Sequence, residues 1–485
     1  MMNDQQIGIY DFSEEVRKAL SGLEYEQLTD VQQQVIPLVL EGKDSIVKAE
    51  TGSGKTAAFA IPVCERIEID RRNPQALVLT PTRELAVQVK QDISNIGRFK
   101  KIRCAAVFGR QSMEGQKREL AQRVHVIVGT PGRTLDHIER KNIKLEDIKY
   151  LIIDEADKLL DMGFIDQVEA IIEMLPVKRT TLLFSATMPE RISEICSTYM
   201  RDPVRVEIAS LQPVAQQIEQ SYYEVDEHEK TELLHKLIYK VRPDSAILFC
   251  NTRERADVVA ASLRKAGFVC ESLHGGLEQR ERLQTMERFK RGEVHFLVAT
   301  DVAARGIHVD DVGLVVNVDI PLDKETYVHR IGRTGRAGSQ GLAVTFALPR
   351  ELSFLAALEE YVDCKISRWN FPSAEEVAAG RASFAAGRME KSELKPLKSE
   401  QLNKEITRIR INGGKRTKMR PGDILGAITS MAGITAADIG IIDIQDTCSY
   451  VEIHGEKGRM VLEALPATKI KGKIYSSRLV PCRSL

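Results

Sequence analysis

The chain has 485 residues, a formal net charge of zero, 43% hydrophobic residues and 28% charged residues. This composition is typical of a globular protein, and the length exceeds what one hydrophobic core supports, so we expect about two to four domains. Charged residues interrupt every apolar run well before the ~18 residues that a membrane span requires, and the N-terminus lacks the pattern of a secretory signal. These patterns argue against a membrane partner and predict a cytoplasmic location.

Charge distribution and cysteine spacing indicate which ligands the protein could bind. The segment from Asn403 to the end contains 14 Lys/Arg and 8 Asp/Glu, a net charge of +6, so the preceding chain carries −6. A basic end indicates a polyanion-binding module, although a solvated charged surface explains the same count equally well. The eight cysteines have no CxxC pair and no nearby histidine pair, which argues against zinc and disulfides and predicts reduced, mostly buried thiols.

Short runs rich in Val, Ile and Leu alternate with helix-length polar stretches in two successive parts of the chain. In the first part the runs are 45–48, 76–80, 105–108, 124–128, 150–153 and 181–184. In the second part they are 246–250, 269–273, 296–299, 314–318 and 343–346. This rhythm predicts two α/β domains in tandem, each with a parallel sheet covered by helices on both faces. The polar stretch 210–220, which contains Pro213, is predicted to link them.

The last part of the chain has a different organisation. Residues 371–402 are rich in Ala, Lys, Glu and Ser, which predicts a charged, partly helical tether. Beyond it we expect a β-α-β-β-α-β unit, with strands at 406–411, 441–444, 449–453 and 473–479 and helices at 420–432 and 457–465. The predicted division is therefore 1–209, 210–370, the linker 371–402, and a small α+β domain at 403–485.

A glycine-rich segment, Ala49-Glu-Thr-Gly-Ser-Gly-Lys-Thr56, follows the first predicted strand and precedes an apolar, helix-like stretch. It fits a phosphate-binding loop except that Ala49 replaces the first glycine. Lys55 can reach the β/γ oxygens of a nucleotide and Thr56 can bind Mg²⁺, while the glycines let backbone N–H groups surround the phosphates. A glycine-rich turn before a helix is the alternative, but the strand–loop–helix context favours nucleotide binding. The nucleotide-binding residues predicted in this loop are Thr51, Gly52, Ser53, Gly54, Lys55 and Thr56.

Two carboxylates, Asp154 and Glu155, end a buried strand downstream of this loop. An acid at a strand end beside a phosphate loop is where Mg²⁺ needs a ligand, which predicts that Asp154 binds the metal. Glu155 would then orient and polarise the attacking water. Alone, an Asp-Glu pair also fits an ordinary helix N-terminus, and only its combination with the phosphate loop favours catalysis.

Alternating Gly and Arg distinguish the segment His329-Arg-Ile-Gly-Arg-Thr-Gly-Arg336 in the second domain. We interpret it as a run of exposed arginines, because planar guanidinium groups recognise anions by paired hydrogen bonds. Arg333 and Arg336 are the predicted arginine fingers for the γ-phosphate, a role that accelerates phosphoryl transfer. A simple RNA-backbone patch is the alternative.

At this point the motifs carry a family resemblance. The chain resembles a DEAD-box RNA helicase, with Asp154-Glu155-Ala156-Asp157 as the name motif. Over about residues 20–350, the other family motifs follow in order: Pro81-Thr-Arg-Glu-Leu-Ala86, Thr130-Pro-Gly-Arg133, Ser185-Ala-Thr187, Ala299-Thr-Asp301, Ala304-Arg-Gly306 and the segment 329–336. The resemblance implies two tandem RecA-like domains and an ATP- and Mg²⁺-dependent enzyme that acts on RNA.

The resemblance also assigns roles to individual residues. Gln32 would read the adenine edge, with Tyr25 packing beside the nucleotide. Asp157, Ser185, Thr187 and His329 would couple hydrolysis to domain closure. The residues implied to contact RNA are Arg83, Gly109, Thr130, Gly132 and Arg133 in the first domain, and Arg253, Gly275, Gln279, Arg282, Thr300 and Asp301 in the second. Such groups contact phosphates and sugars without reading bases, and contacts to 2′-hydroxyls would favour RNA over DNA.

The chain departs from the family pattern in three regions. Glu24-Tyr25 stands where the family has Gly before an aromatic, and Leu28 replaces a proline. Ile7 lies where an aromatic is expected upstream of Gln32. His308 replaces an Asp expected near the ribose, which would alter nucleotide affinity or its pH dependence, or stands as a neutral surface substitution.

Residues 403–485 resemble a divergent RNA-recognition motif (RRM) domain. Tyr450 is the only stacking aromatic at the expected strand positions, so the sheet is a poor platform for single strands, where stacking contributes roughly 1–3 kcal/mol per base. The basic residues Lys415, Arg416 and Lys418 instead predict recognition of structured RNA through its backbone. The whole layout resembles the bacterial DbpA/YxiN helicases, in which the tail binds a hairpin of large-subunit ribosomal RNA.

We therefore predict a monomeric, ATP-dependent helicase that locally unwinds RNA during large-subunit assembly, with the pre-ribosomal particle as its partner. An ATP-gated RNA clamp is the first alternative, although a scaffold has no need of Glu155, Arg333 and Arg336 together. A translocating DNA helicase is the second.

Overall fold

The computed structural model describes residues 10–49, 52–208, 218–304, 312–335, 341–387, 402 and 405–481. It forms two compact units, one comprising Met1–Ile208 with Leu397–Leu485 and the other Ala209–Pro396. The first unit therefore contains the first α/β domain and the tail domain, and the second unit contains the second α/β domain.

The first domain is built on a parallel sheet with the strand order β3-β4-β2-β5-β6-β1-β7. The strands are β1 Ser45–Lys48, β2 Ala76–Leu79, β3 Cys104–Val107, β4 Val126–Gly129, β5 Tyr150–Ile153, β6 Thr180–Ser185 and β7 Val204–Glu207. The first six confirm the predicted runs, because buried strands of a parallel sheet are continuously apolar. The seventh, Val-Arg-Val-Glu, lies at the sheet edge and was not predicted, since its alternation leaves only one side chain buried.

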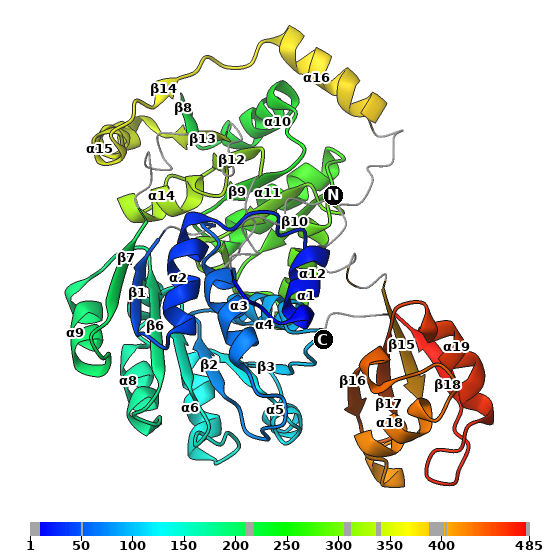
Figure 1. Cartoon of the computed structure of the whole chain (residues 1–485). Coiled ribbons are helices and arrows are strands. Elements are labelled where there is room, and N and C mark those ends of the chain that lie inside the picture. The colour runs from blue at the N-terminus through cyan, green and yellow to red at the C-terminus, as the bar shows by residue number, and fades with distance from the viewer. Residues whose placement is uncertain are drawn as a thin grey trace. The chain divides into compact units, whose positions relative to one another are not determined.

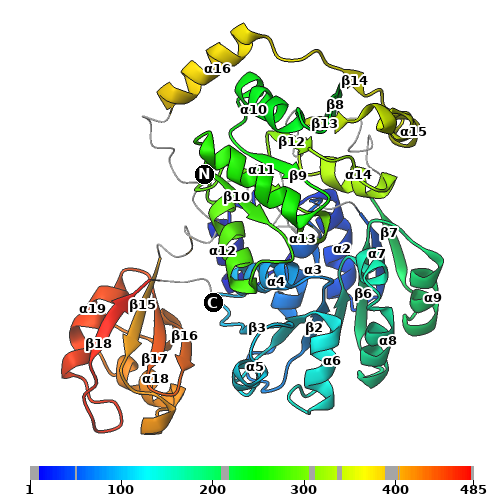
Figure 2. The same ribbon diagram turned by 180° about the vertical axis from the view of Figure 1, so that it is seen from behind.

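Helices cover both faces of this sheet, as predicted (Figures 1 and 2). One apolar cluster joins the sheet to α1–α4, and a second joins its other face to α6–α9. The helices are α1 Glu14–Gly22, α2 Asp30–Leu40, α3 Lys55–Arg66, α4 Arg83–Ile96, α5 Met113–Leu120, α6 Pro131–Glu139, α7 Ala156–Asp161, α8 Ile165–Met174 and α9 Glu190–Tyr199.

The second domain has its own parallel sheet, with the order β10-β11-β9-β12-β13-β8-β14. Its strands are β8 Ile218–Glu224, β9 Ala246–Phe249, β10 Cys270–Leu273, β11 Phe296–Ala299, β12 Leu314–Asn317, β13 Gly341–Ala347 and β14 Ser367–Arg368. The helices are α10 Lys230–Val241, α11 Arg253–Lys265, α12 Gln279–Lys290, α13 Asp301–Ala304, α14 Lys324–Ile331 and α15 Leu352–Val362. Residues 218–220, predicted as linker, are instead the start of β8, where the buried Ile218 pairs with Gly341 of β13.

The start of the predicted tether is a helix packed on the second domain. This helix, α16 (Ala374–Gly387), lies against α10. Phe384 packs on Phe268 with ring centroids 4.7 Å apart, and Arg381 lies over the Tyr239 ring at 5.3 Å. Gly380 permits the close crossing, because a Cβ there would lie 2.0 Å from the Tyr239 carbonyl oxygen. The remaining tether residues, 388–401, lie outside the described part of the chain.

The tail domain confirms the predicted β-α-β-β-α-β order. Its antiparallel sheet has the strand order β16-β17-β15-β18. Its elements are β15 Ile406–Ile411, α18 Pro421–Thr429, β16 Ile439–Ile444, β17 Ser449–His454, α19 Lys457–Ala464 and β18 Ser477–Val480. Ile409 and Val451 point into the core with both helices, so the alternate residues Arg408, Tyr450 and Glu452 lie on the outer face of the sheet. The last strand begins later than predicted, because Lys473 instead bridges to Ile470 across a turn.

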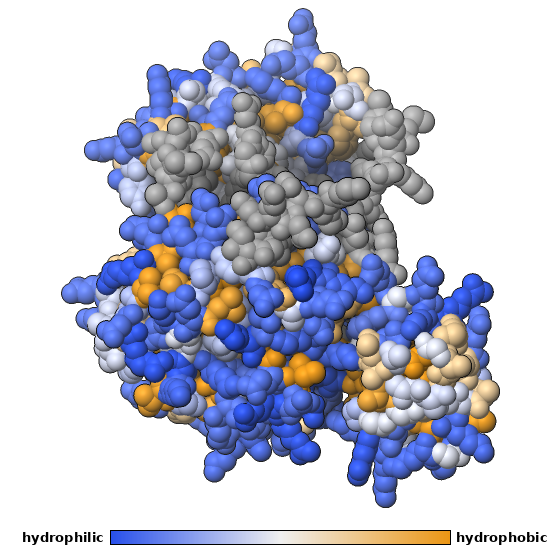
Figure 3. All heavy atoms as spheres, in the orientation of Figure 1, coloured by the Kyte–Doolittle hydropathy of each residue, from blue (hydrophilic) through white to orange (hydrophobic). Residues whose placement is uncertain are grey.

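The surface and the cysteines agree with a globular protein. Hydrophilic residues cover most of the first-domain face visible in Figure 3, and hydrophobic residues lie there in small groups. Among the helices that the structure describes, none is long and apolar enough to span a membrane. The seven described cysteines are free thiols, and all except Cys364 are buried, as predicted.

Candidate functional site

Three neighbouring strands of the first sheet end at the predicted nucleotide site. Strand β6 pairs in parallel with β1 on one side and with β5 on the other. Since the carboxyl ends of parallel strands share one edge of a sheet, this pairing brings together the loop after Lys48, the acids after Ile153, and Ser185. The sequence motifs with the strongest chemical signals therefore converge at one place.

The phosphate loop has the backbone that its glycines predict. Gly52 and Gly54 have φ angles of 90° and 92°, which other residues adopt only with strain. The buried Lys55 begins α3, and its Nζ donates a hydrogen bond of 2.9 Å to the carbonyl oxygen of Ala49, so the side chain folds back across the loop. Thr56 follows in the first turn of α3, and Thr51 lies outside the described residues.

Thr29 and Gln32 hold this loop from the start of α2. The Thr29 hydroxyl donates to the Ser53 carbonyl oxygen at 2.8 Å, and the Gln32 side-chain amide donates to that of Gly54 at 3.2 Å. The Gln32 oxygen accepts from the Thr29 backbone N–H at 3.0 Å, which closes a capping box. Gln32 thus supports the loop, and its contact with adenine remains a prediction. Sequence reasoning missed the role of Thr29, although a Thr three residues before a Gln is a capping signal.

Tyr25 is largely buried against the apolar cluster of the first domain. Burial, and next the charge of Asp92, raise the pKa of Tyr25 to about 12. The phenol is therefore neutral at every physiological pH, and its predicted contact with a nucleotide remains untested.

The two acids after β5 are both buried and tightly held. Asp154 Oδ1 accepts the Glu155 backbone N–H at 3.0 Å. Glu155 caps α7 in the left-handed region, with φ 50° and ψ 54°, a conformation that costs a non-glycine residue about 1–3 kcal/mol and is concentrated at functional sites. Its Oε1 accepts a hydrogen bond of 2.8 Å from Lys158 Nζ. Lys158 was not predicted, although its spacing of three residues on a helix was a usable signal.

The coupling residues of the first domain form one hydrogen-bonded group. Asp157 Oδ2 accepts from the backbone N–H of Thr187 at 3.1 Å and from its hydroxyl at 3.2 Å. The Asp157 backbone N–H donates to the Ser185 hydroxyl at 3.1 Å. The helix that carries the acids is therefore tied to the end of β6. His329, the fourth predicted member, lies on α14 of the second domain.

The predicted RNA contacts of the first domain follow the other strands of the same sheet. Arg83 begins α4 after β2, Gly109 follows β3, and Arg133 lies on α6 after β4. A Cβ on Gly109 would lie 3.4 Å from Arg83 Nη2, so the guanidinium packs against this glycine. Arg133 donates to the Gln111 carbonyl oxygen at 3.1 Å and to Gln116 Oε1 at 2.9 Å. Thr130 caps α6, and Gly132, in its first turn, would meet nothing within 4 Å of an added Cβ.

In the second domain the predicted RNA residues also follow strand ends. Arg253 begins α11 after β9, Gly275 follows β10, and Thr300 follows β11. The other three are Gln279 and Arg282 on α12 and Asp301 at the start of α13. Asp301 has a structural partner, because each of its two oxygens accepts a hydrogen bond of 2.6 Å from Arg330.

Arg330 corrects the predicted run of exposed arginines. Its side chain is 1% exposed, and it also donates to Asn251 Oδ1 at 2.8 Å and to the Asp319 carbonyl oxygen at 2.6 Å. Arg330 therefore joins the segments after β9, β11 and β12, and packing and charge pairing explain this member of the motif. Arg333, which follows α14, is also buried, with 5% of it exposed, so the prediction of exposed arginines is wrong for this residue too. Arg336 and His308 lie outside the described residues.

The basic residues of the tail domain lie on one exposed turn. Lys415 and Arg416 belong to a short 3₁₀ helix, and Lys418 follows it with a φ angle of 56°. Tyr450 lies on β17 with the Arg408 guanidinium 4.6 Å from its ring centroid, so a cation already covers one face of this aromatic.

Three protein-family models match successive parts of the chain. They are the DEAD/DEAH box helicase model at residues 29–195, the helicase conserved C-terminal domain at 229–338, and the DbpA RNA binding domain at 408–478. The fold and these matches define an ATP-dependent RNA helicase with two RecA-like domains and an RNA-binding tail.

Relatives and solved structures agree with this class. The chain is 50% identical to the ATP-dependent RNA helicase DbpA of Bacillus subtilis (strain 168), over 96% of this chain and 97% of that protein. It is 40% identical to DbpA of Escherichia coli (strain K12), over 95% and 96%. It also resembles the structure of S. cerevisiae Dbp5 bound to RNA and ADP BeF3, with a TM-score of 0.69, 30% identity, and 79% and 99% of the two chains covered. The chain belongs to the DEAD-box family of ATP-dependent RNA helicases and, within it, to the DbpA type.

Replacement of Gly54 by alanine is expected to weaken ATP binding. The new Cβ would lie 2.5 Å from Gln32 Nε2 and 2.9 Å from Thr29 Oγ1, at a φ angle of 92°. We expect a loss of about tenfold or more in affinity, equal to about 1.4 kcal/mol, in a fluorescent-nucleotide titration. Gly132→Ala is the matched control, because open space surrounds that position. Wild-type affinity in a folded Gly54→Ala protein would contradict this account of the loop.

Proposed function

We propose that this helicase locally unwinds large-subunit ribosomal RNA during ribosome assembly, in the cytoplasm and as a monomer, and that its tail selects the site. The observation that carries the proposal is the tail itself. It is a small RRM-like domain with an exposed basic turn, and its residues 408–478 match the DbpA RNA binding domain. A family of helicase cores that contacts RNA backbone without reading bases needs such a module to direct it.

In the proposed mechanism, the first sheet binds ATP at one part of its edge. Lys55 contacts the phosphates together with the backbone N–H groups of the loop. Thr56, in the first turn of α3 after β1, and Asp154, directly after β5, offer a hydroxyl and a carboxylate oxygen, the ligand types that Mg²⁺ takes. Both β1 and β5 pair with β6. When bound, Mg²⁺ would neutralise charge on the phosphate oxygens. Glu155 orients the attacking water, and Arg333 and Arg336 stabilise the charge that develops on the transferred phosphoryl group.

The remainder of the same edge is proposed to hold RNA. Arg83 and Arg133 contact phosphates, and Arg83 packs against Gly109 of the neighbouring loop. Asp157 is hydrogen-bonded to Ser185 and to Thr187, so it connects the segment after the two acids with the end of β6. Binding of ATP and RNA then favours the same closed state, in which a bent strand is incompatible with a duplex. The tether keeps the core at high effective concentration near the tail's target.

Hairpin-dependent ATPase activity tests the role of the tail. We expect a large-subunit rRNA fragment with the hairpin to stimulate ATP hydrolysis far more than unrelated structured RNA, and DNA to stimulate it least. A variant with Lys415, Arg416 and Lys418 replaced by alanine should lose the preference, and its salt slope should fall by roughly one per lost phosphate contact. Arg459→Ala is the control, because Arg459 is an exposed tail residue on α19. Equal stimulation by every RNA would refute the proposal that the tail selects the RNA site.

The substitution Glu155→Gln tests the catalytic assignment. The amide keeps the size of the side chain but cannot act as a base, so we expect RNA and ATP to bind while turnover falls by about a hundredfold or more. Steady-state hydrolysis and RNA binding in the presence of ATP measure the two effects. Glu146→Gln, at an exposed position, should leave both unchanged. Brisk turnover by the Glu155→Gln enzyme would remove Glu155 from the mechanism.

A further inference from the structure

The outer face of the tail sheet contacts the first domain within the first compact unit. Glu452 on β17 is only 2% exposed, although its neighbours in the sheet point outward with it. Its Oε1 lies 3.2 Å from Nη2 of Arg98, which follows α4 and is itself 7% exposed. Two opposite charges far apart in the sequence are therefore buried against each other. Because an ion pair is desolvated only at a cost, such burial indicates a close-fitting contact.

Further donors from the same stretch of the first domain reach backbone carbonyl groups of the tail. Lys101 Nζ donates to the Ala436 carbonyl oxygen at 3.0 Å. Arg103 donates to the Ile442 carbonyl oxygen on the edge strand β16. An edge strand has carbonyl groups without sheet partners, so an arginine that binds one also covers the edge. These contacts hold β16 and the turn before it by backbone groups and do not require a particular side chain there.

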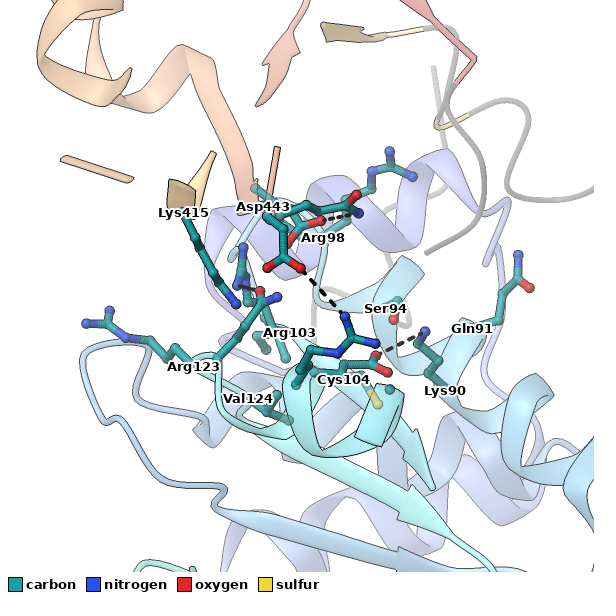
Figure 4. A pocket seen from close by; sticks show the side chains of 18 of the residues that line it. Lys90, Gln91, Ser94, Arg98, Arg103, Cys104, Arg123, Val124, Lys415 and Asp443 are labelled. Atoms are coloured by element: carbon teal, nitrogen blue, oxygen red, sulfur yellow. Dashed lines mark hydrogen bonds and ion pairs between the residues drawn. The ribbon is translucent and has the colours of Figure 1, made fainter. Parts of the chain in front are cut away.

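The two contacting surfaces carry complementary charges. The tail is basic overall, yet three of its acids, Asp443, Asp446 and Glu452, lie on this side. Arg98, Arg103 and Arg118 of the first domain face them, and Arg118 lies 3.6 Å from Asp446. Figure 4 shows Arg98 and Arg103 from the first domain and Lys415 and Asp443 from the tail around one pocket. Acids are thus placed where the opposite surface is basic, which favours association of the correct faces.

Apolar contacts complete the surface. The rings of Phe99 and His454 meet edge to face with centroids 5.3 Å apart, and Lys18 Nζ lies 4.6 Å from the Phe99 ring centroid. Leu402 and Ile406, on either side of the start of β15, are buried in the apolar cluster of the first domain. The segment that leads into the tail therefore packs on the first domain, as the tail sheet does.

We propose that the basic surface formed by Arg98, Lys101, Arg103 and Arg118 is a docking site for the acidic side of the chain's own tail sheet. Docking covers the β16–β17 part of the face on which RRM-like sheets bind single strands. It leaves Lys415, Arg416 and Lys418 exposed, so the surface proposed to bind structured RNA stays accessible. The tail then travels with the first domain until the contact opens. This inference concerns free protein and does not depend on the proposed RNA target.

Protonation of His454 should weaken docking. Burial, followed by the charges of Lys101, Lys18 and Arg98, lowers the pKa of His454 to about 4, while the Ala437 carbonyl raises it slightly and Glu452 lies on the same strand face. The docked state holds the imidazole in its neutral form, so docking is fully favourable above the ordinary histidine pKa near 6.5. As the pH falls toward 4, the undocked state gains a proton that the docked state does not, and docking weakens. Between about pH 7.5 and 5.5 the docking equilibrium should fall by about tenfold if the undocked imidazole titrates normally.

Hydrogen exchange of the full-length, ligand-free protein tests the proposal. Arg98→Glu should raise exchange about tenfold in the tail strands β16 and β17, because it places the like charges of the new glutamate and Glu452 together. The double variant with Arg98→Glu and Glu452→Arg should restore protection by reversing the pair. Arg72→Glu, at an exposed position of the first domain, is the control and should change nothing in the tail.

A second variant guards against a folding defect. Lys101→Glu removes a donor at a half-buried site and should loosen the same tail strands while the melting temperature of the first domain is preserved. Unchanged tail exchange in both Arg98→Glu and Lys101→Glu proteins would overturn the proposal. Failure of the double variant to recover protection beyond the single ones would do the same. Neither outcome affects the ATPase or hairpin experiments.

Discussion

Parallel pairing of β6 with β1 and β5 is the constraint on which the catalytic geometry depends. The register places Lys48 opposite Ser185 and Ile153 opposite Leu183, so the segments that follow β1, β5 and β6 begin at nearly the same level. Each strand ends in a motif with a different chemistry: a phosphate loop, two acids, and a pair of hydroxyls bonded to Asp157. A one-residue slip of β6 would separate Ser185 from Asp157 and turn its side chains to the other face.

The same edge also has separate positions for the two proposed ligands, ATP and RNA. The strands nearest β6 carry the nucleotide motifs, whereas β2, β4 and β3 carry Arg83, Arg133 and Gly109. Because β2 pairs directly with β5, the acids and Arg83, which is predicted to contact RNA, follow neighbouring strands. The proposed ATP and RNA positions of the first domain therefore lie next to each other along the sheet edge. In the second domain too, segments that follow neighbouring strands are held together at one sheet edge, there by hydrogen bonds from Arg330.

Much of this arrangement was predictable from the sequence, because buried parallel strands and glycine-rich loops have strong local signatures. The predictions failed where the decisive partner is distant. The edge strand β7 buries only one side chain, and the start of β8 alternates buried and exposed residues, so both resemble polar linkers in sequence. In the sequence Arg330 lies in a Gly- and Arg-rich run, which predicts an exposed side chain. Its partners Asp301, Asn251 and Asp319 follow other strands and cannot be recognised locally. Arg98 and Glu452 are separated by most of the chain, and neither has a local pattern that indicates a buried pair.

The central claim is that ATP hydrolysis by this core separates RNA strands near a site chosen by the tail. Strand displacement on a short RNA duplex joined to the rRNA hairpin tests it most directly. The account predicts fast displacement with ATP, slow displacement when the hairpin is removed, and no displacement by the Glu155→Gln enzyme under turnover conditions. Tight, ATP-dependent binding of the same RNA without any strand separation would contradict it and would indicate an ATP-gated clamp.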